Sequence, residues 1–210
     1  MHRQINHKTM RLIIGLIAVL LAPMTWWLAE QPLSSISSSY WSDSRDIFVG
    51  SLITVGFFLS AYNGSGGSKD LEFYLSKLSC VFAIAIALFP TLGKGNNQAP
   101  PAWTESLSGV FGLIPDEVHL GASILLFACL IVMIWFFSMR AMAKGKSVRA
   151  WIYRSIAISM ATGIILLQII GSLAEWQNTT LWVEIWGLTL FGIGWLVAGA
   201  YKTEEPSAET

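Results

Sequence analysis

The chain has 210 residues, and its 13 basic and 13 acidic side chains give a formal net charge of zero. Only 12% of the residues are charged, against roughly 25% in a soluble domain, while 54% are hydrophobic and the mean hydropathy is +0.58. This composition indicates a membrane protein and excludes an ordinary soluble domain. The lack of a basic run argues against nucleic-acid binding.

Six apolar stretches are long enough, or nearly so, to cross a hydrocarbon core, which takes roughly 20 helical residues. Each must be helical within lipid, because only a helix satisfies its own backbone hydrogen bonds there. The sequence therefore predicts an all-α bundle of six transmembrane helices, forming one domain over residues 1–203, with a short acidic tail over 204–210. The predicted helices cover residues 12–28, 47–62, 74–91, 118–139, 151–173 and 181–201.

The distribution of Lys and Arg predicts the orientation of this bundle. With a cytoplasmic N-terminus, the inner segments would hold all the basic residues except Arg45 and Lys94. Cytoplasmic loops of membrane proteins carry such an excess of positive charge. We therefore expect both termini to be cytoplasmic.

The longest connection, residues 92–117, lies on the outer side in this topology. Loops of this length are often lids or binding loops. Its stretch 107–114 is apolar, so we expect this part to lie on the membrane or to fold over the bundle.

Ionisable residues in apolar segments are functional candidates, because each costs about 2.5–3.5 kcal/mol at a helix centre. Asp46, His119 and Glu184 lie at the outer ends of three predicted helices, at one depth. We expect them to surround a small polar pocket as candidate catalytic residues. The candidate ligand-binding residues around it are Ser39, Tyr40, Arg45, Ser123 and Trp186.

The same three residues are also a candidate metal site. One imidazole and two carboxylates suit several divalent ions, so Asp46, His119 and Glu184 could hold one metal ion. A site of three histidines is not available, because His2 and His7 lie in the N-terminal tail. A purely structural explanation exists for Asp46, since acidic residues at helix starts are favoured by the helix dipole.

Several short motifs resemble a group of uncharacterised bacterial integral membrane proteins. The motifs are SSYW (38–41), RDIFVG (45–50), ALFPT (87–91), VH (118–119), YR (153–154), WVE (182–184) and FGIGWL (191–196). The resemblance extends from Ser34 onward and implies a multi-pass protein of the bacterial inner membrane. More distantly, a Ser, an Asp and a His at helix ends resemble the superfamily of alkaline ceramidases and progestin–adiponectin-type receptors. That superfamily has seven helices and a zinc ion held by three histidines, whereas this sequence has six predicted helices and one suitable histidine.

Three functions remain open on this basis. A polar cluster at one interface favours binding of a membrane lipid or of a membrane partner, either another protein or a second copy of the chain. A lipid-modifying hydrolase using Asp46, His119 and Glu184 is the first alternative. A small transporter is the second, although the predicted helices carry no midplane charge and show no inverted repeat.

Overall fold

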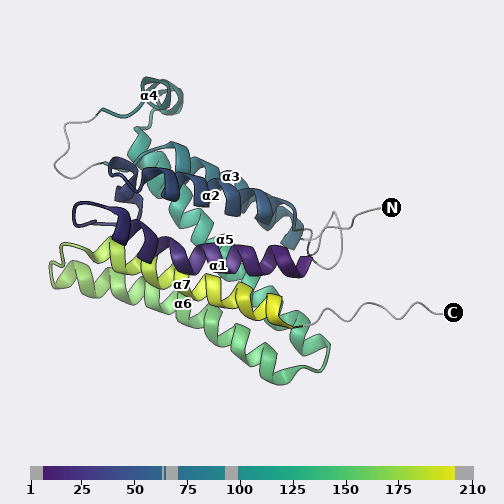
Figure 1. Ribbon diagram of the computed structural model, residues 1–210. Helices are drawn as coiled ribbons and strands as arrows, with labels where there is room; N and C mark the ends of the chain where they lie inside the picture. Colours follow the sequence, from purple (N-terminus) through teal and green to yellow (C-terminus); the bar gives the residue numbers. More distant parts are fainter. Residues whose placement is uncertain (1–6, 63, 65–70, 93–98, 202–210) are drawn as a thin grey trace.

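A computed structural model describes residues 7–62, 64, 71–92 and 99–201 of the chain. These residues form seven α-helices and one 3₁₀ helix and contain no strand, which confirms the all-helical prediction (Figure 1). In chain order the elements are α1 (His7–Leu28), η1 (Ser37–Trp41), α2 (Arg45–Ser60), α3 (Leu71–Leu88), α4 (Ala102–Gly109), α5 (Pro115–Ala143), α6 (Ser147–Leu173) and α7 (Thr179–Ala200).

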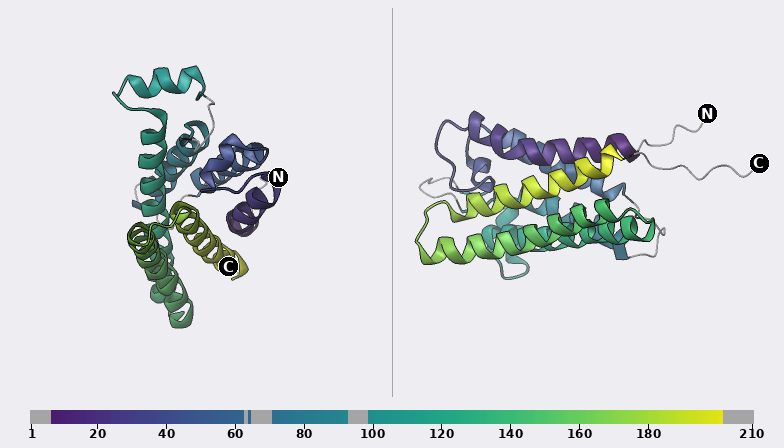
Figure 2. Two further views of the ribbon diagram at one scale, coloured as in Figure 1. Left: turned by 90° about the vertical axis from the view of Figure 1, so that its left-hand side faces the viewer. Right: turned by 90° about the horizontal axis from the view of Figure 1, so that it is seen from below.

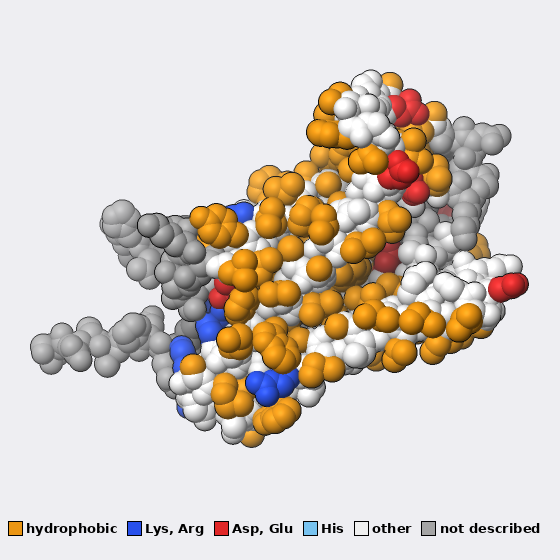
Figure 3. Space-filling model, turned by 180° about the vertical axis from the view of Figure 1, so that it is seen from behind, with side chains coloured by type: hydrophobic (Ala, Val, Ile, Leu, Met, Phe, Trp, Pro, Cys, Tyr) orange, Lys and Arg blue, Asp and Glu red, His pale blue; other side chains and the backbone are white. Residues whose placement is uncertain are grey.

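Five helices (α1, α3, α5, α6 and α7) are long and apolar enough to cross a membrane. The sixth long helix, α2, has 16 residues, fewer than the roughly 20 that a hydrocarbon core requires. Large apolar side chains cover much of the face of the bundle that Figure 3 shows, and each of the six long helices exposes at least one of them. Such a surface is expected of helices that face lipid.

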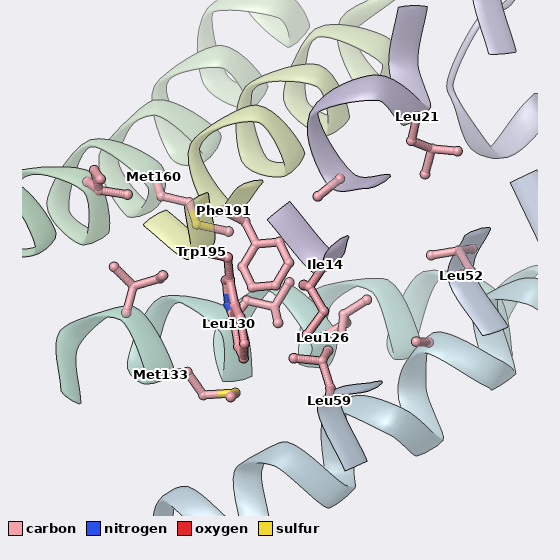
Figure 4. Packing of buried hydrophobic residues seen from close by; sticks show 14 of the residues in the cluster. Ile14, Leu21, Leu52, Leu59, Leu126, Leu130, Met133, Met160, Phe191 and Trp195 are labelled. Carbon is pink, nitrogen blue, oxygen red and sulfur yellow. The ribbon is translucent and has the colours of Figure 1, made fainter. Parts of the chain in front are cut away.

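The six long helices close into a ring. Helix α1 packs between α2 and α7, α6 packs between α7 and α5, and α3 packs between α5 and α2. The end-on view in Figure 2 shows this arrangement, with α4 lying beyond the edge of the ring. The centre of the ring is filled by fully buried side chains, among them Trp195, Phe191, Ile14 and Leu59 (Figure 4).

The first and last helices approach each other closely at Gly15 and Gly192. A β-carbon added to Gly15 would lie 2.8 Å from the carbonyl oxygen of Gly192, and one added to Gly192 would lie 2.8 Å from that of Gly15. Small residues permit such backbone contact between membrane helices. This contact joins the two ends of the chain and closes the ring.

Two short helices occupy segments for which the sequence predicts no helix. Element η1 precedes α2, and α4 lies within the 92–117 connection, at the end of the bundle where α5 begins. Helix α3 ends at Leu88 rather than at residue 91, because Pro90 cannot continue a helix. The remainder of that connection, 93–98, and the tail 204–210 lie outside the described residues.

Charged side chains are separated between the two ends of the ring, as Figure 3 shows in part. The end at which α1, α3 and α6 begin is here called the basic end, and the opposite end the acidic end. At the basic end lie Lys8, Arg11, Lys77, Arg140, Lys144, Lys146, Arg149 and Arg154, with Glu72. At the acidic end lie Glu30, Asp43, Asp46, Glu105, Asp116, Glu117, Glu175 and Glu184, with Arg45.

Candidate functional site

Glu184 on α7 binds the start of η1. Its Oε2 accepts a hydrogen bond of 2.5 Å from the backbone N–H of Ile36, and its Oε1 accepts one of 2.5 Å from the Ser37 hydroxyl. Both carboxylate oxygens are therefore occupied by η1. Ser39, a predicted ligand-binding residue, is fully buried in the same element and donates to the carbonyl oxygen of Ile36.

His119 near the start of α5 is buried against the end of α3. Its side chain is 5% exposed, and Nδ1 lies 2.7 Å from the carbonyl oxygen of Phe89, which makes Nδ1 the protonated nitrogen. Asp116, one turn earlier, accepts hydrogen bonds from the Thr91 hydroxyl at 2.9 Å and from the backbone N–H of Leu92 at 2.8 Å. His119 and Asp116 thus hold the segment that leaves α3 against the start of α5.

Asp46, at the start of α2, is exposed, and its carboxylate makes no hydrogen bond or ion pair within the described part of the chain. No three or more His, Cys, Asp or Glu side chains among the described residues come together in a way that could hold a metal ion. Among the described residues the structure does not bring Asp46, His119 and Glu184 together, and a metal site formed by these three residues stays a prediction. Chain direction places all three at one end of the bundle, but His119 and Glu184 contact different neighbouring segments. A catalytic role for any one of them stays a prediction.

Two further predicted ligand-binding residues make hydrogen bonds within the bundle, and their role in ligand binding stays a prediction. The Trp186 indole N–H donates a hydrogen bond of 2.9 Å to the carbonyl oxygen of Ser159, which joins α7 to α6. Gly163 on α6 leaves the space that this indole occupies, because an added β-carbon would clash with it. The Ser123 hydroxyl donates to the carbonyl oxygen of His119 within α5, at 2.8 Å.

The remaining predicted ligand-binding residues, Tyr40 and Arg45, line a cavity of about 660 Å³ at the acidic end, here called the larger cavity. The Arg45 guanidinium lies 4.4 Å from the centre of the Tyr40 ring and donates a hydrogen bond of 3.0 Å to the Tyr40 hydroxyl. The other lining residues are Glu30, Gln31, Pro32, Leu33, Ser34, Ser38, Trp41, Ser42, Asp43, Ala99 and Pro101.

The charges around the larger cavity are not paired with one another. The described residues contain one salt bridge, between Arg140 and Glu72 at the opposite end of the ring. Arg45 therefore lines the larger cavity without a carboxylate partner among the described residues, and the exposed residues Glu30 and Asp43 also line it. This cavity offers both signs of charge to a ligand.

A second cavity of about 390 Å³, here called the smaller cavity, adjoins the larger one. Trp41 lines both cavities, and its indole N–H donates a hydrogen bond of 2.7 Å to the carbonyl oxygen of Thr91. Trp41 also packs edge-on against Tyr40, with ring centres 5.2 Å apart. The other lining residues are Pro90, Thr91, Leu92, Pro100, Glu105, Ser108, Leu113, Ile114, Pro115 and Asp116.

Sequence reasoning did not single out Trp41, Glu30 or Asp43 as site residues. Trp41 follows directly after Tyr40 in the polar run before α2, so the pattern that pointed to Tyr40 also contained it. Glu30 carries no such signal, because it comes from the end of α1 and reaches the cavity only through the turn of residues 29–36.

Sequence reasoning also missed a buried ionic cluster at the basic end. Glu72 on α3 is 5% exposed and pairs with Arg140 on α5. Tyr62 lies two residues beyond the end of α2. Its hydroxyl donates a hydrogen bond of 2.9 Å to the Glu72 carboxylate and accepts one of 2.7 Å from the Arg140 guanidinium. Burial raises the pKa of the Tyr62 hydroxyl well above its usual range. The cluster joins α2, α3 and α5.

Comparisons with protein-family models, with curated proteins and with solved structures found no match to this chain. The resemblance to bacterial integral membrane proteins stays a prediction.

Proposed function

We propose that this chain is a multi-pass protein of the bacterial inner membrane that binds the headgroup of a membrane lipid in its larger cavity. The observation that carries this proposal is the Arg45 guanidinium, which lies on the Tyr40 ring at one end of an apolar bundle and has no carboxylate partner among the described residues. A guanidinium is suited to a phosphate group because its N–H donors match the phosphate oxygens. The apolar surface of the bundle would also be surrounded by lipid in a membrane, so lipid molecules would be close to the larger cavity.

In the proposed topology all six long helices cross the membrane and both termini are cytoplasmic. The separation of charge supports this orientation, because the basic end would lie in the cytoplasm, where Lys and Arg accumulate. Helix α2 packs side by side with α1 and α3, so it crosses with them. Its 16 residues span about 24 Å, and a short helix is accommodated by local thinning of the bilayer.

Binding at the acidic end fits the structure better than passage through the ring. The centre of the ring is filled by Trp195, Phe191 and Leu130, which are fully buried or nearly so. The two described cavities lie at the acidic end, around Trp41. On this topology they open toward the outer leaflet.

Reporter fusions test the orientation. Fusions after residues 68 and 145 are expected to report a cytoplasmic position, and one after residue 100 a periplasmic position. A reversed pattern would place the larger cavity in the cytoplasm and overturn the assignment to the outer leaflet.

Lipid binding is tested by native mass spectrometry of the full-length protein in mild detergent. Wild type is expected to retain phospholipid, and Arg45→Gln to bind it about ten- to a hundredfold more weakly, since a hydrogen bond to a charged group contributes about 1.5–3 kcal/mol. Asp46→Asn is the matched control, because Asp46 is adjacent and exposed but does not line the larger cavity. Equal binding by wild type and Arg45→Gln would contradict the proposal.

A further inference from the structure

The two cavities at the acidic end share one wall and differ in character. Trp41 lines both, while Pro101 borders the larger cavity and Pro100 the smaller one. The volumes of about 660 and 390 Å³ both fall within the roughly 300–1,000 Å³ typical of small-molecule sites. A ligand that fills both must therefore pass beside the Trp41 indole.

The larger cavity is polar. Its described wall includes three serine side chains, those of Ser34, Ser38 and Ser42. The described part of the wall also carries one cation, Arg45, and the two carboxylates of Glu30 and Asp43. A ligand with a single negative charge would satisfy Arg45 but would meet the field of both carboxylates. A group with one anionic and one cationic centre would satisfy both signs.

The smaller cavity is mainly apolar. Besides the Trp41 ring, its wall includes Leu92, Leu113, Ile114 and three prolines. Leu113 and Ile114 are 41% and 50% exposed, so this wall is continuous with the apolar surface of the bundle. Of the two carboxylates on this wall, Asp116 already accepts hydrogen bonds from Thr91 and Leu92, and Glu105 on α4 is exposed to solvent. This cavity therefore suits hydrocarbon better than a second charged group.

We propose that the ligand of this site is a zwitterionic phospholipid whose headgroup lies in the larger cavity and whose acyl chain enters the smaller one. Arg45 contacts the phosphate, Glu30 and Asp43 contact the ammonium group, and the Trp41 ring separates headgroup from chain. This assignment rests on the proposed lipid-binding function and specifies the class of lipid.

Direct titrations of three compounds into the full-length, delipidated protein in mild detergent test the assignment. Dihexanoyl phosphatidylethanolamine carries the zwitterionic head and short chains, dihexanoyl phosphatidylglycerol carries the same chains with an anionic head, and glycerophosphoethanolamine is the head without chains. The first is expected to bind at least tenfold more tightly than either of the others. A double variant, Glu30→Gln with Asp43→Asn, is expected to remove the preference for the zwitterionic head.

A pair of leucine variants tests the position of the chain. Leu113 lines the smaller cavity and Leu107 does not, although their exposed fractions are similar at 41% and 47%. Leu113→Asn is expected to weaken the binding of dihexanoyl phosphatidylethanolamine about fivefold or more. It is expected to leave the binding of glycerophosphoethanolamine unchanged. Leu107→Asn is expected to leave both unchanged.

The outcomes distinguish a wrong class or position of the lipid from a failure of lipid binding at Arg45 itself. If phosphatidylglycerol binds as tightly as phosphatidylethanolamine, the zwitterionic assignment is wrong. If the head compound binds as tightly as the lipid and Leu113→Asn has no effect, the acyl chain does not lie in the smaller cavity. In both cases a loss of binding in Arg45→Gln would still support the proposed function. If binding of all three compounds is independent of Arg45, the proposed function itself fails.

Discussion

Glu184 and Ser37 are 147 positions apart in the chain, yet the Ser37 hydroxyl donates a hydrogen bond of 2.5 Å to the Glu184 carboxylate. The second carboxylate oxygen accepts the backbone N–H of Ile36. Because Tyr40 and Trp41 are the last two residues of η1, this contact at its start positions both aromatic side chains on the wall of the larger cavity. Glu184 is thus a positioning residue of the proposed site.

Replacing Glu184 by Gln should loosen η1. The Gln amide has an NH₂ donor in place of one carboxylate oxygen, so in the same position it presents a donor to either Ile36 or Ser37 and loses the charge-assisted bonds to both. We expect a loss of about 1.5–3 kcal/mol in the free energy of unfolding, measured by denaturant titration in mixed micelles. Lipid binding should also weaken. Glu175→Gln, in the exposed turn after α6, is the control and should change neither quantity. Unchanged stability in Glu184→Gln would contradict the positioning role.

The buried cluster at the basic end should be sensitive to removal of one partner. Arg140→Met would leave the Glu72 carboxylate buried and uncompensated, which typically costs about 3–5 kcal/mol. The double variant Arg140→Met with Glu72→Gln removes the buried charge and should recover at least half of that loss. The same unfolding titration measures both variants. A double variant less stable than Arg140→Met would show that the charge on Glu72 has another partner.

Ionisation of Tyr62 should make the free energy of unfolding depend on pH above about pH 10. Burial raises the pKa of its hydroxyl above the ordinary value of 10.0, so the folded state keeps this proton when the unfolded chain loses it. The contribution is present below about pH 10 and is lost as pH rises further. The free energy of unfolding should therefore fall more steeply above pH 10 in wild type than in Tyr62→Phe. Parallel curves would show that Tyr62 ionises as easily in the folded protein.

Much of the fold was predictable because apolar runs of about 20 residues have few alternatives to a helix in lipid. The predicted ranges overlap the six long helices, although the crossing of the membrane by α2 is still a proposal. The short helices were not predictable from local sequence. Element η1 is held by Glu184, far along the chain, and α4 follows two prolines in a connection rich in glycine and proline.

The site was predictable only in part, and the reason is geometric. Chain direction places a residue at one end of a bundle, but the rotation of each helix about its own axis decides what the side chain meets. Asp46, His119 and Glu184 share one end of the ring, yet His119 contacts Phe89 while Glu184 contacts η1. Tyr40 and Arg45 were predictable as neighbours because they belong to one short polar segment.

A pair of glycine variants tests the packing that closes the ring. In Gly192→Ala the new β-carbon would lie 2.8 Å from the Gly15 carbonyl oxygen and 2.6 Å from Val19, so α1 and α7 would have to separate. Overpacking of this kind costs about 1–3 kcal/mol. In Gly50→Ala on α2 the β-carbon would meet nothing within 4 Å, and Ala is favoured over Gly in a helix by roughly 0.5–1 kcal/mol. Unfolding titrations should show opposite signs for the two variants, and a gain for Gly192→Ala would disprove the close contact.

Helix α4 and the turn that follows it bury polar side chains and expose apolar ones. Thr104 and Ser108 are almost fully buried, whereas Val110 and Phe111 are 76% and 72% exposed. This inverted pattern is typical of an amphipathic segment that lies in the membrane interface. A polarity-sensitive fluorophore on Val110→Cys should therefore report an apolar environment in nanodiscs, and one on Ser106→Cys, also exposed on α4, an aqueous one. The native Cys80 and Cys129 are buried and should label little. Equal, water-like emission from both positions would show that this face does not rest on lipid and leave a partner protein as its occupant.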